Sequence, residues 1–420
     1  MRILYLCADP GIPVLGSKGA SLHVRALATA LAALGHEVAL VAPTLTRTLW
    51  EKPAELDLPL EHVPPSDAIG AAARGLKSFA ETVGEPGFVG GEVRRMLYNK
   101  ELRSVLKRRL ERCRPDVIFE RASLFGTAGA EVADELGVPL LVELNAPLVL
   151  EHAIYRSGAL GDLAAAAERF VLTRADVVLP VSAVLADHAM DIGTSPDRVH
   201  VLPNGVDPDA FRPGPADPAL REALGLDGGP VLGFVGGLRP WHGLEALPAL
   251  VETLTQRHPT LRLVVAGDGP LRAELGSAFE RRGLSAHVVF TGALSHSEIP
   301  GLIRSLDIAL APYPAHEHGF YFSPLKLFEY MACGVAVVAP ALGQIAEVAR
   351  SGETALLYPA GDPDAFAGAC EHLLEDKALR RGIGEAAARE VRARYTWSRN
   401  AEAVVELAEQ VTGARELVPA

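Results

Sequence analysis

The chain has 420 residues, of which 49% are hydrophobic and 22% are charged, and its formal net charge is −12. These values are ordinary for a globular protein and exclude the disordered and low-complexity classes. The negative charge argues against general nucleic-acid binding. A chain of this length exceeds what one hydrophobic core holds, so we expect two domains of roughly 200 residues with a deep cleft between them.

The sequence shows no sign of a membrane span, a secretion signal or a disulfide framework. It has no apolar run of about 18 residues, and Asp9 and Pro10 interrupt the first apolar stretch too early for a signal peptide. The cysteines are widely spaced without a CxxC pair, so no zinc site is indicated and all are expected to be buried: Cys7, Cys113, Cys333 and Cys370. We therefore expect a cytoplasmic protein.

Short apolar runs alternate with longer helical patterns, which is typical of parallel sheets joined by crossover helices. The strands predicted in the first half are 2–8, 36–43, 116–121, 139–145 and 176–182. The helices predicted between them are 23–37, 103–113 and 126–137. This order predicts one doubly wound α/β domain.

A loop with three glycines, DPGIPVLGSKGAS, follows the first strand and precedes a helix that should begin near Leu22. Its glycines, Gly16 among them, do not form GxGxxG, so a dinucleotide fingerprint is absent. The loop is either a phosphate-approach loop or a flexible turn. His23 and His152 fall near the expected cleft, although a single histidine at a helix start is more often structural.

Residues 92–114 form a basic helical segment on an acidic chain, with nine Lys or Arg against three Glu. The apolar stripe within it favours a solvated helix face, and contact with an anionic membrane surface or an anionic acceptor is the alternative. The Pro/Gly-rich segment 64–100 suggests a mobile segment that lines the cleft or touches lipid. Peripheral contact with the inner membrane surface through residues 70–114 therefore stays open.

A Pro/Gly/Asp-rich connector at 203–218 separates the halves, and the strand pattern then restarts. The strands predicted in the second half are 231–237, 261–269, 287–293, 308–314 and 335–340. We place an N-terminal domain at 1–205, a C-terminal domain at 206–395 and a final helix at 396–420 that packs back on the N-terminal domain. Ligands of such sheets bind outside the carboxyl ends of the strands.

The segment SPLKLFEYMACG, residues 323–334, is predicted to be a helix that begins at Pro324. Ser323 is a favourable N-cap, Pro suits the first helical position, and Gly334 supplies a left-handed stop. An ordinary capped helix would have the same pattern.

The first turn of this helix could receive phosphate. The free N–H groups of Leu325 and Lys326 would point from the positive end of the helix dipole, with the Lys326 ammonium beside them. Glu329 shares the face of Lys326, and its carboxylate could accept two hydroxyls of a ribose or a sugar.

Taken in order, several motifs of this chain resemble those of glycosyltransferase family 4. They are PNGVD at 203–207, FVGGLRPWHG at 234–243, AGDGP at 266–270, FTG at 290–292, SPLKLFEYMACG and the closing YTW at 395–397. The resemblance covers nearly the whole chain. It implies a GT-B fold of two Rossmann-like domains facing a cleft, a nucleotide-diphosphate sugar bound by the C-terminal domain, retention of configuration, and no metal or other cofactor.

The resemblance assigns Glu329 to the donor ribose, as the second glutamate of the family's E-x7-E pattern. The first glutamate falls on Tyr321, so the usual carboxylate contact to the donor sugar is missing there. Glu317 and His318 could replace it only through a different loop path.

The family's Arg and Lys pair for the diphosphate falls on Gly237 and His242. Arg239 and Lys326 are the nearest replacements, so we interpret the change as a relocation of positive charge. The family's nucleobase contact, made by backbone after FTG, falls on Ala293 and Leu294.

On the acceptor side, two predicted strands end in polar residues: Glu120, Arg121, Glu143 and Asn145. The family often has His at position 145. Asn cannot take a proton, so Asn145 would orient a hydroxyl or the sugar while the departing phosphate oxygen accepts the proton. Double displacement would need a carboxylate, for which Glu143 and Glu151 are available by type.

The sequence thus predicts a retaining hexosyltransferase with a UDP- or GDP-type donor and a sugar, natural-product or lipid-linked hydroxyl acceptor. The catalytic residues expected are Arg239, Lys326 and Asn145. The donor-binding residues expected are Gly16, Arg239, Leu294, Ser323, Leu325, Lys326 and Glu329. The acceptor-binding residues expected are His23, Glu120, Arg121, Glu143 and Asn145. The alternatives are a nucleotide-sugar epimerase or hydrolase on the same scaffold, and a catalytically weakened sugar-nucleotide-binding subunit.

Overall fold

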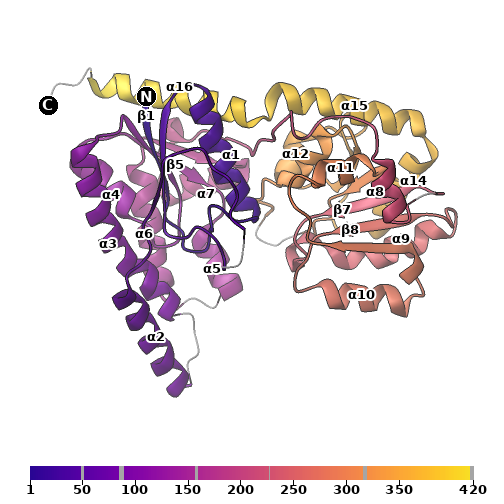
Figure 1. The fold of residues 1–420 in the computed structure, drawn as a ribbon, viewed down its shortest axis with the longest axis horizontal. Helices are drawn as coiled ribbons and strands as arrows, with labels where there is room; N and C mark the ends of the chain where they lie inside the picture. The colour runs from indigo at the N-terminus through magenta and orange to yellow at the C-terminus, as the bar shows by residue number, and fades with distance from the viewer. Residues whose placement is uncertain (49–51, 85–88, 157–158, 227, 316–318, 417–420) are drawn as a thin grey trace. The chain divides into compact units, whose positions relative to one another are not determined.

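The structure is a computed structural model of the chain and describes residues 1–48, 52–84, 89–156, 159–226, 228–315 and 319–416. It divides into two compact units. Unit 1 comprises Met1–Pro203 and Trp397–Ala420, and unit 2 comprises Asn204–Thr396. The chain therefore passes from unit 1 to unit 2 after Pro203 and returns after Thr396. Each unit contains one parallel sheet packed with helices (Figure 1).

The sheet of unit 1 has the strand order β3-β2-β1-β4-β5-β6, and neighbouring strands are parallel. Its strands are β1 (Arg2–Cys7), β2 (Glu37–Ala42), β3 (Leu60–His62), β4 (Val117–Arg121), β5 (Leu140–Leu144) and β6 (Val177–Pro180). The order reverses between β1 and β4. In an open parallel sheet, the crevice for a ligand lies at this reversal, outside the carboxyl ends of the strands.

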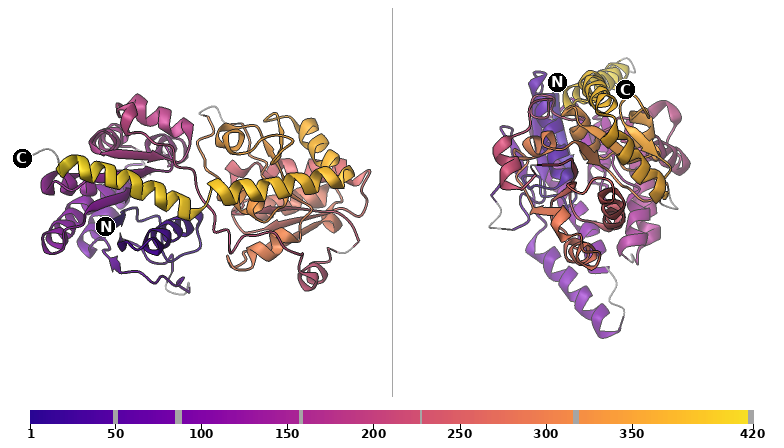
Figure 2. Two further views of the ribbon diagram at one scale, coloured as in Figure 1. Left: turned by 90° about the horizontal axis from the view of Figure 1, so that it is seen from above. Right: turned by 90° about the vertical axis from the view of Figure 1, so that its right-hand side faces the viewer.

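The helices of unit 1 include the last helix of the chain. They are α1 (Gly19–Ala33), α2 (Asp67–Thr82), α3 (Val89–Arg112), α4 (Ala128–Leu136), α5 (Leu148–Arg156), α6 (Gly161–Arg174), α7 (Ala183–Ile192) and α16 (Trp397–Glu416). A 3-10 turn, η1, spans Pro196–Arg198. Helix α16 packs against α1, and Figure 2 shows it in yellow from above.

The sheet of unit 2 has the order β12-β11-β10-β7-β8-β9, which repeats the plan of unit 1 and reverses between β7 and β10. Its strands are β7 (Val231–Val235), β8 (Arg262–Ala266), β9 (Val288–Gly292), β10 (Ile308–Leu310), β11 (Ala336–Pro340) and β12 (Leu356–Tyr358). Its helices are α8 (Pro218–Ala223), α9 (Leu247–Thr255), α10 (Arg272–Arg281), α11 (Ile299–Arg304), α12 (Leu325–Ala332), α13 (Gly343–Val348), α14 (Pro363–Glu375) and α15 (Lys377–Arg394). Three 3-10 turns are η2 (Pro240–His242), η3 (Leu244–Ala246) and η4 (Ser285–His287).

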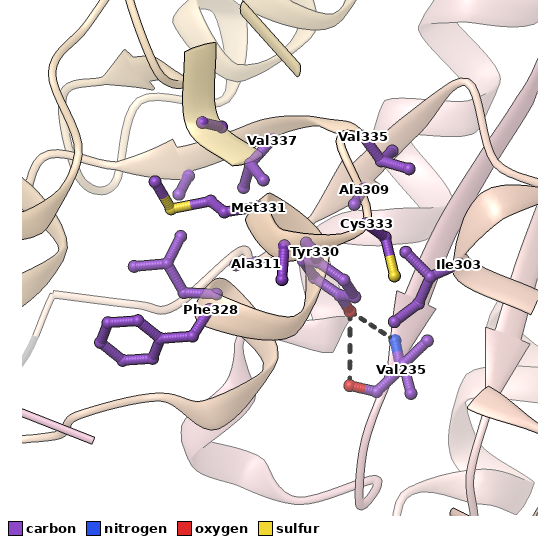
Figure 3. Close-up of a cluster of buried hydrophobic side chains, with 14 of the residues drawn as sticks. Val235, Ile303, Ala309, Ala311, Phe328, Tyr330, Met331, Cys333, Val335 and Val337 are labelled. Carbon is purple, nitrogen blue, oxygen red and sulfur yellow. Dashed lines mark hydrogen bonds between the residues drawn. The ribbon is translucent and has the colours of Figure 1, made fainter. Parts of the chain in front are cut away.

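The central strands form the core of each unit because helices cover both faces of a parallel sheet. Every residue of β4, β5, β7 and β11 is buried. Full burial of one such apolar side chain contributes about 1.5–3 kcal/mol. Figure 3 shows part of the core of unit 2, where residues of β7, β10 and β11 surround Tyr330 and Met331 of α12. Helix α12 is therefore anchored to the sheet through its apolar face.

The predicted α/β class is confirmed, and each strand predicted from an apolar run is present. The sequence patterns miss β3 and β12. Each has only three residues and lies at a sheet edge, so neither offers enough apolar periodicity to distinguish it from a loop.

The segment 64–100, in which the sequence patterns identified no helix before residue 92, contains α2 and the first half of α3 in its described part, and its mobility stays a prediction. Its glycines lower helix propensity and so hide the helix from a sequence pattern. Ser66 caps α2 by accepting a hydrogen bond from Ile69 N–H at 3.4 Å. At Gly90 a Cβ would lie 2.6 Å from the Ala73 carbonyl oxygen, so a glycine lets the two helices pack closely.

The cysteines differ from prediction at one position. Cys7, Cys333 and Cys370 are buried as expected, whereas Cys113 is exposed. Helix α3 ends at Arg112, so Cys113 lies beyond the apolar stripe that packs this helix.

Candidate functional site

The candidate site of unit 2 lies where the strand order reverses, between β7 and β10. The loop after β7 carries Arg239, Trp241 and His242, and the segment after β10 carries Tyr313. Helix α12 places the Lys326 amine against this loop. Three segments that are distant in sequence therefore meet at the carboxyl ends of the central strands, where doubly wound sheets bind nucleotides.

Helix α12 begins at Leu325, one residue later than predicted, with Pro324 rather than Ser323 as its N-cap residue. The Ser323 hydroxyl instead accepts a hydrogen bond from Asn204 N–H at 2.9 Å, and its carbonyl accepts one from Asn204 Nδ2 at 2.6 Å. Asn204 thus fixes the approach to α12. Sequence reasoning missed this role because the two residues are 119 positions apart.

Tyr330 anchors α12 to the end of β7. Its hydroxyl accepts a hydrogen bond from Val235 N–H at 2.7 Å and donates one to the Val235 carbonyl at 3.4 Å (Figure 3). Gly334 ends the helical segment with a φ of 73°, the left-handed conformation predicted for it. The first turn of α12 is therefore held firmly at the carboxyl edge of the sheet.

The amine of Lys326 is the most unusual group of this site. Its side chain is 7% exposed, and its Nζ has no hydrogen-bond partner among the described residues. It lies 4.2 Å from the centre of the Phe234 ring and 5.1 Å from that of Tyr313. Burial lowers the pKa of Lys326 to about 7, and Glu329 opposes only part of this effect. A buried amine without a hydrogen-bond partner is costly, which makes Lys326 a candidate for a functional role.

Gly236 makes room for this amine. Its φ is 145°, and a Cβ on this residue would lie 3.0 Å from Lys326 Nζ. A larger residue would therefore meet both backbone strain and the lysine. Gly236 belongs to the loop on which the family carries its diphosphate cations, so the Lys326 amine reaches that loop from α12.

His242 carries no positive charge at neutral pH. Burial and the nearby Lys326 lower the pKa of His242 to about 3, and its Nδ1 donates a hydrogen bond to the Gly237 carbonyl at 2.6 Å. Arg239 is half-buried, with its guanidinium carbon 5.8 Å from the centre of the Trp241 ring. The positive charge of this part of unit 2 therefore resides on Lys326 and Arg239.

Glu329 lies one turn after Lys326 and is half-buried. Its Oε1 is 3.5 Å from Nε2 of His296, whose ring centre is 5.2 Å from that of Phe211. Leu294 lies two residues after β9 and packs against the edge of the core.

Tyr321 fills the position of the family's first glutamate with an aromatic side chain. Tyr321 is buried, and its ring centre is 4.3 Å from that of Phe322. Phe320 lies beside Phe322 and Tyr313, at 5.4 and 5.0 Å between ring centres. Packing thus replaces a carboxylate here. Glu317 and His318, the possible substitutes, lie outside the described residues.

In unit 1, three of the predicted residues bond to a fourth, Glu143, near the carboxyl ends of β4 and β5. His23 comes from α1, Arg121 is the last residue of β4, and Asn145 directly follows β5. We call these four residues the Glu143 cluster: His23, Arg121, Glu143 and Asn145. Glu143 Oε1 lies 2.5 Å from His23 Nε2. Glu143 Oε2 accepts hydrogen bonds from Arg121 and Asn145, each at 2.8 Å.

The charge of Glu143 is fixed by these partners. Burial alone would raise the pKa of Glu143, but His23, Arg121 and Asn145 together lower it to about 2. A carboxylate with both oxygens bonded orients its neighbours better than it attacks or accepts a proton. Asn145 donates through Nδ2, so its Oδ1 is the end that can accept a hydrogen bond from a ligand.

Glu120 does not join the Glu143 cluster, because adjacent residues of a strand point to opposite faces of the sheet. It is 1% exposed, and its Oε2 has no hydrogen-bond partner in the described part of the chain. A Cβ on Gly129 would lie 2.0 Å from this oxygen. Burial raises the pKa of Glu120 to about 8. Glu120 is thus a neutral buried acid, and its predicted acceptor contact is not supported by its position.

Two other predicted positions are engaged within unit 1. His152 Nε2 lies 2.7 Å from Glu92 Oε1, and both side chains are buried, which indicates a structural pair. Gly16 donates its N–H to the Pro13 carbonyl at 2.8 Å and accepts from Arg25 Nη1 at 2.8 Å. The glycine loop is thus a fixed turn whose Gly16 amide is already used.

Several basic residues of α3 are paired inside unit 1, which favours the solvated-face interpretation. The pairs are Arg95 with Asp9, Arg103 and Lys107 with Glu135, and Arg109 with Glu61. None of the described helices is both long and apolar enough to span a bilayer. Among all residues that the structure describes, no group of three or more His, Cys, Asp or Glu side chains is placed to hold a metal ion.

Two family models match the chain. One, described as Glycosyltransferase Family 4, matches residues 17–210, and the other, described as Glycosyl transferases group 1, matches residues 229–376.

Curated relatives are about 30% identical. A 2-deoxystreptamine glucosyltransferase of Streptomyces kanamyceticus is 30% identical over 60% of this chain and 65% of its own length. D-inositol 3-phosphate glycosyltransferases of Acidothermus cellulolyticus and Mycobacterium bovis are 30% and 31% identical, over 72% and 69% of this chain. The chain spans 69% and 60% of their lengths, so it covers less than two thirds of two of these three relatives.

Solved structures share the fold over almost the whole chain. Sucrose-phosphate synthase of Thermosynechococcus elongatus has a TM-score of 0.71 at 20% identity and covers 99% of this chain and 100% of its own. Anabaena HepE in complex with UDP has a TM-score of 0.68 at 19% identity and covers all of both chains.

Proposed function

The chain belongs to glycosyltransferase family 4, and from this premise we propose that it transfers a hexosyl unit from a nucleotide-diphosphate sugar to a hydroxyl acceptor. Its fold is GT-B, with one Rossmann-like domain in each unit. Unit 2 binds the donor and unit 1 binds the acceptor. The observation that carries this proposal is the buried Lys326 amine without a hydrogen-bond partner at the strand reversal of unit 2.

The donor diphosphate binds at the first turn of α12. The Lys326 amine and the N–H groups of Leu325 and Lys326 provide charge-assisted hydrogen bonds, and Arg239 adds a second cation. Ser323 supports the turn through its bonds to Asn204. Burial disfavours the charged form of the Lys326 amine, and a diphosphate bound beside it would stabilise that form. This supports the assignment of the diphosphate to this place.

The nucleoside is bound by the neighbouring elements. Glu329 accepts the ribose hydroxyls, since its carboxylate lies on the same helix one turn from Lys326. The backbone at Leu294, after β9, contacts the nucleobase. This assignment rests on the resemblance; Leu294 lies two residues after the end of β9.

The transfer retains the anomeric configuration and uses no metal ion. The bond between the anomeric carbon and the diphosphate oxygen breaks as the acceptor oxygen forms a bond on the same face. The acceptor proton moves to the departing phosphate oxygen. Asn145 Oδ1 accepts a hydrogen bond from the reacting hydroxyl or the sugar, and Lys326 and Arg239 stabilise the leaving diphosphate. Of the two carboxylates considered for double displacement, Glu143 has both side-chain oxygens bonded to neighbouring residues, which disfavours it as a nucleophile. Glu151 lies half-buried in the first turn of α5, and nothing in its position favours it for that role.

Ring polyols are the first acceptors to test. Two of the curated relatives are named for 2-deoxystreptamine and D-inositol 3-phosphate, both of which are hydroxylated six-membered carbocycles.

The experiment incubates the protein with UDP-, GDP-, ADP- and dTDP-sugars and with cyclitol, sugar and lipid-linked acceptors. The readouts are the released nucleotide and the anomer of the product. A product of retained configuration supports the proposal. Donor breakdown independent of acceptor would favour a hydrolase or epimerase, and donor binding without turnover would favour a binding subunit.

A further inference from the structure

A residue at each of the two points where the chain crosses between the units contacts a candidate site. Asn204, the first residue of unit 2, holds Ser323 ahead of α12. Trp397, the first residue after the return to unit 1, packs on His23 of the Glu143 cluster. The proposed reaction has so far given no role to Trp397.

Trp397 is the first residue of α16 and is 8% exposed. Its ring centre lies 4.7 Å from that of His23, with the planes tilted by 58°. His23 is itself 3% exposed, and its Nε2 faces Glu143. A continuous series of contacts therefore runs from Trp397 through His23 and Glu143 to Asn145.

The backbone at Trp397 is fixed by bonds on either side of the crossing. Within unit 1, Asn400 Nδ2 of α16 donates a hydrogen bond to the Pro203 carbonyl at 2.7 Å. This bond links the segment by which the chain leaves unit 1 to the segment by which it returns. Within unit 2, Val206 N–H donates to the Tyr395 carbonyl at 3.0 Å. The indole therefore stands at the end of a braced segment, and it reaches the Glu143 cluster from there.

We propose that Trp397 is a positioning residue for the acceptor site. Its indole holds the His23 ring in place, so that Glu143 keeps Asn145 in the orientation that transfer needs. This inference rests on the proposed function of unit 1. Because Glu143 divides its two oxygens among His23, Arg121 and Asn145, a rotation of the histidine ring would free Oε1 and change the bonds of the others.

The test compares W397L and W397F with the wild-type protein. Leu removes the aromatic surface that faces His23, whereas Phe keeps an aromatic ring at the same position. The matched control is F366L, which removes an aromatic contact of the same 4.7 Å between Tyr358 and Phe366 in unit 2. Thermal unfolding measures the loss of stability in all three variants.

Two readouts separate positioning from packing. The first is the His23 ring signal in spectra of protein labelled with 15N-histidine, assigned by its disappearance in H23Q. The second is a comparison of kcat/KM for acceptor with the affinity for nucleotide, which shows whether only the acceptor side is affected. We expect W397L to lower kcat/KM for acceptor by on the order of tenfold to a hundredfold with nucleotide affinity within about twofold, and W397F to restore most of the rate.

The His23 signal decides the proposal even where no transfer can be measured. We expect it to shift in W397L and to stay near its wild-type position in W397F and F366L. An unchanged His23 signal in W397L would overturn the proposal, as would a loss of rate equal in W397L and F366L at equal loss of stability. Absence of transfer by the wild-type protein with every acceptor would instead count against the proposed function.

Discussion

The ammonium of Lys326 lies 4.2 Å from the centre of the Phe234 ring, and none of the described residues accepts a hydrogen bond from it. The aromatic face stabilises the cation in part, since cation–π contacts contribute about 0.5–2 kcal/mol. Burial still lowers the pKa of Lys326 to about 7. The amine is therefore only partly charged near neutral pH, and an anion bound beside it would favour the charged form.

Lys326→Met should stabilise the protein near neutral pH while it weakens donor binding. The folded-state pKa of about 7 lies below the usual 10.5, so the lysine contributes its full stability only above pH 10.5 and loses it as pH falls through 7. We expect a gain on the order of 1–3 kcal/mol in the free energy of unfolding at pH 7. Denaturant unfolding at pH 7 and pH 10 measures it, and a variant less stable than wild type at pH 7 would contradict the account.

The protein should take up protons when it binds a nucleotide above neutral pH. A diphosphate beside Lys326 raises the pKa of the amine, so part of the protein population gains a proton on binding at pH 8. Calorimetric titration in two buffers of different ionisation enthalpy gives the number of protons. Lys326→Arg is the matched control, because arginine keeps its charge at every pH used. Equal proton uptake by this variant and the wild-type protein would assign the effect to another group.

Glu120→Gln should change how stability depends on pH. Burial raises the folded-state pKa of Glu120 from 4.5 to about 8, so its contribution to stability is complete below pH 4.5 and is lost as pH rises through 8. Glutamine is neutral throughout. The melting temperature of the variant should therefore rise relative to wild type between pH 5 and pH 9, with transferase activity retained. A difference that stays constant over this range would show that Glu120 is not neutral in the fold.

Asn145→Asp should impair acceptor use more than donor binding. The new carboxylate would face Glu143 Oε2 at the position where Asn145 Nδ2 now donates at 2.8 Å, and two anions would repel each other there. We expect kcat/KM for acceptor to fall by on the order of tenfold to a hundredfold, with nucleotide affinity within about twofold. Asn145→Ala separates lost hydrogen bonding from repulsion, and an aspartate variant as active as wild type would remove Asn145 from the site.

The fold was accessible from the sequence because its signals are local. Apolar runs such as those of β1 and β5 are buried on both faces, so composition alone identifies them. Edge strands of three residues and the glycine-containing α2 carry weaker signals, and long-range packing decides them. A pattern confined to neighbouring residues cannot contain that information.

The candidate sites were only partly accessible for the same reason. The relocation of charge to Lys326 was suggested by motif differences, and the structure supplies what the motif lacks, namely the approach of its amine to Gly236. The opposite faces of Glu120 and Arg121 follow from strand geometry once β4 is known to be a buried strand. The contacts of Asn204 and Trp397 join residues more than 100 positions apart, and no local signal reports them.

The most direct measurement is calorimetric titration of UDP, GDP, ADP and dTDP into the wild-type protein, Lys326→Ala and Lys377→Ala. Lys377 is an exposed lysine at the start of α15 in the same unit and serves as the matched control. Hydrogen bonds to charged groups contribute about 1.5–3 kcal/mol, so one nucleotide should bind the wild-type and control proteins and bind Lys326→Ala tenfold to a hundredfold more weakly. Equal affinity of the three proteins, or binding of no nucleotide, would contradict the assignment of the donor diphosphate to α12.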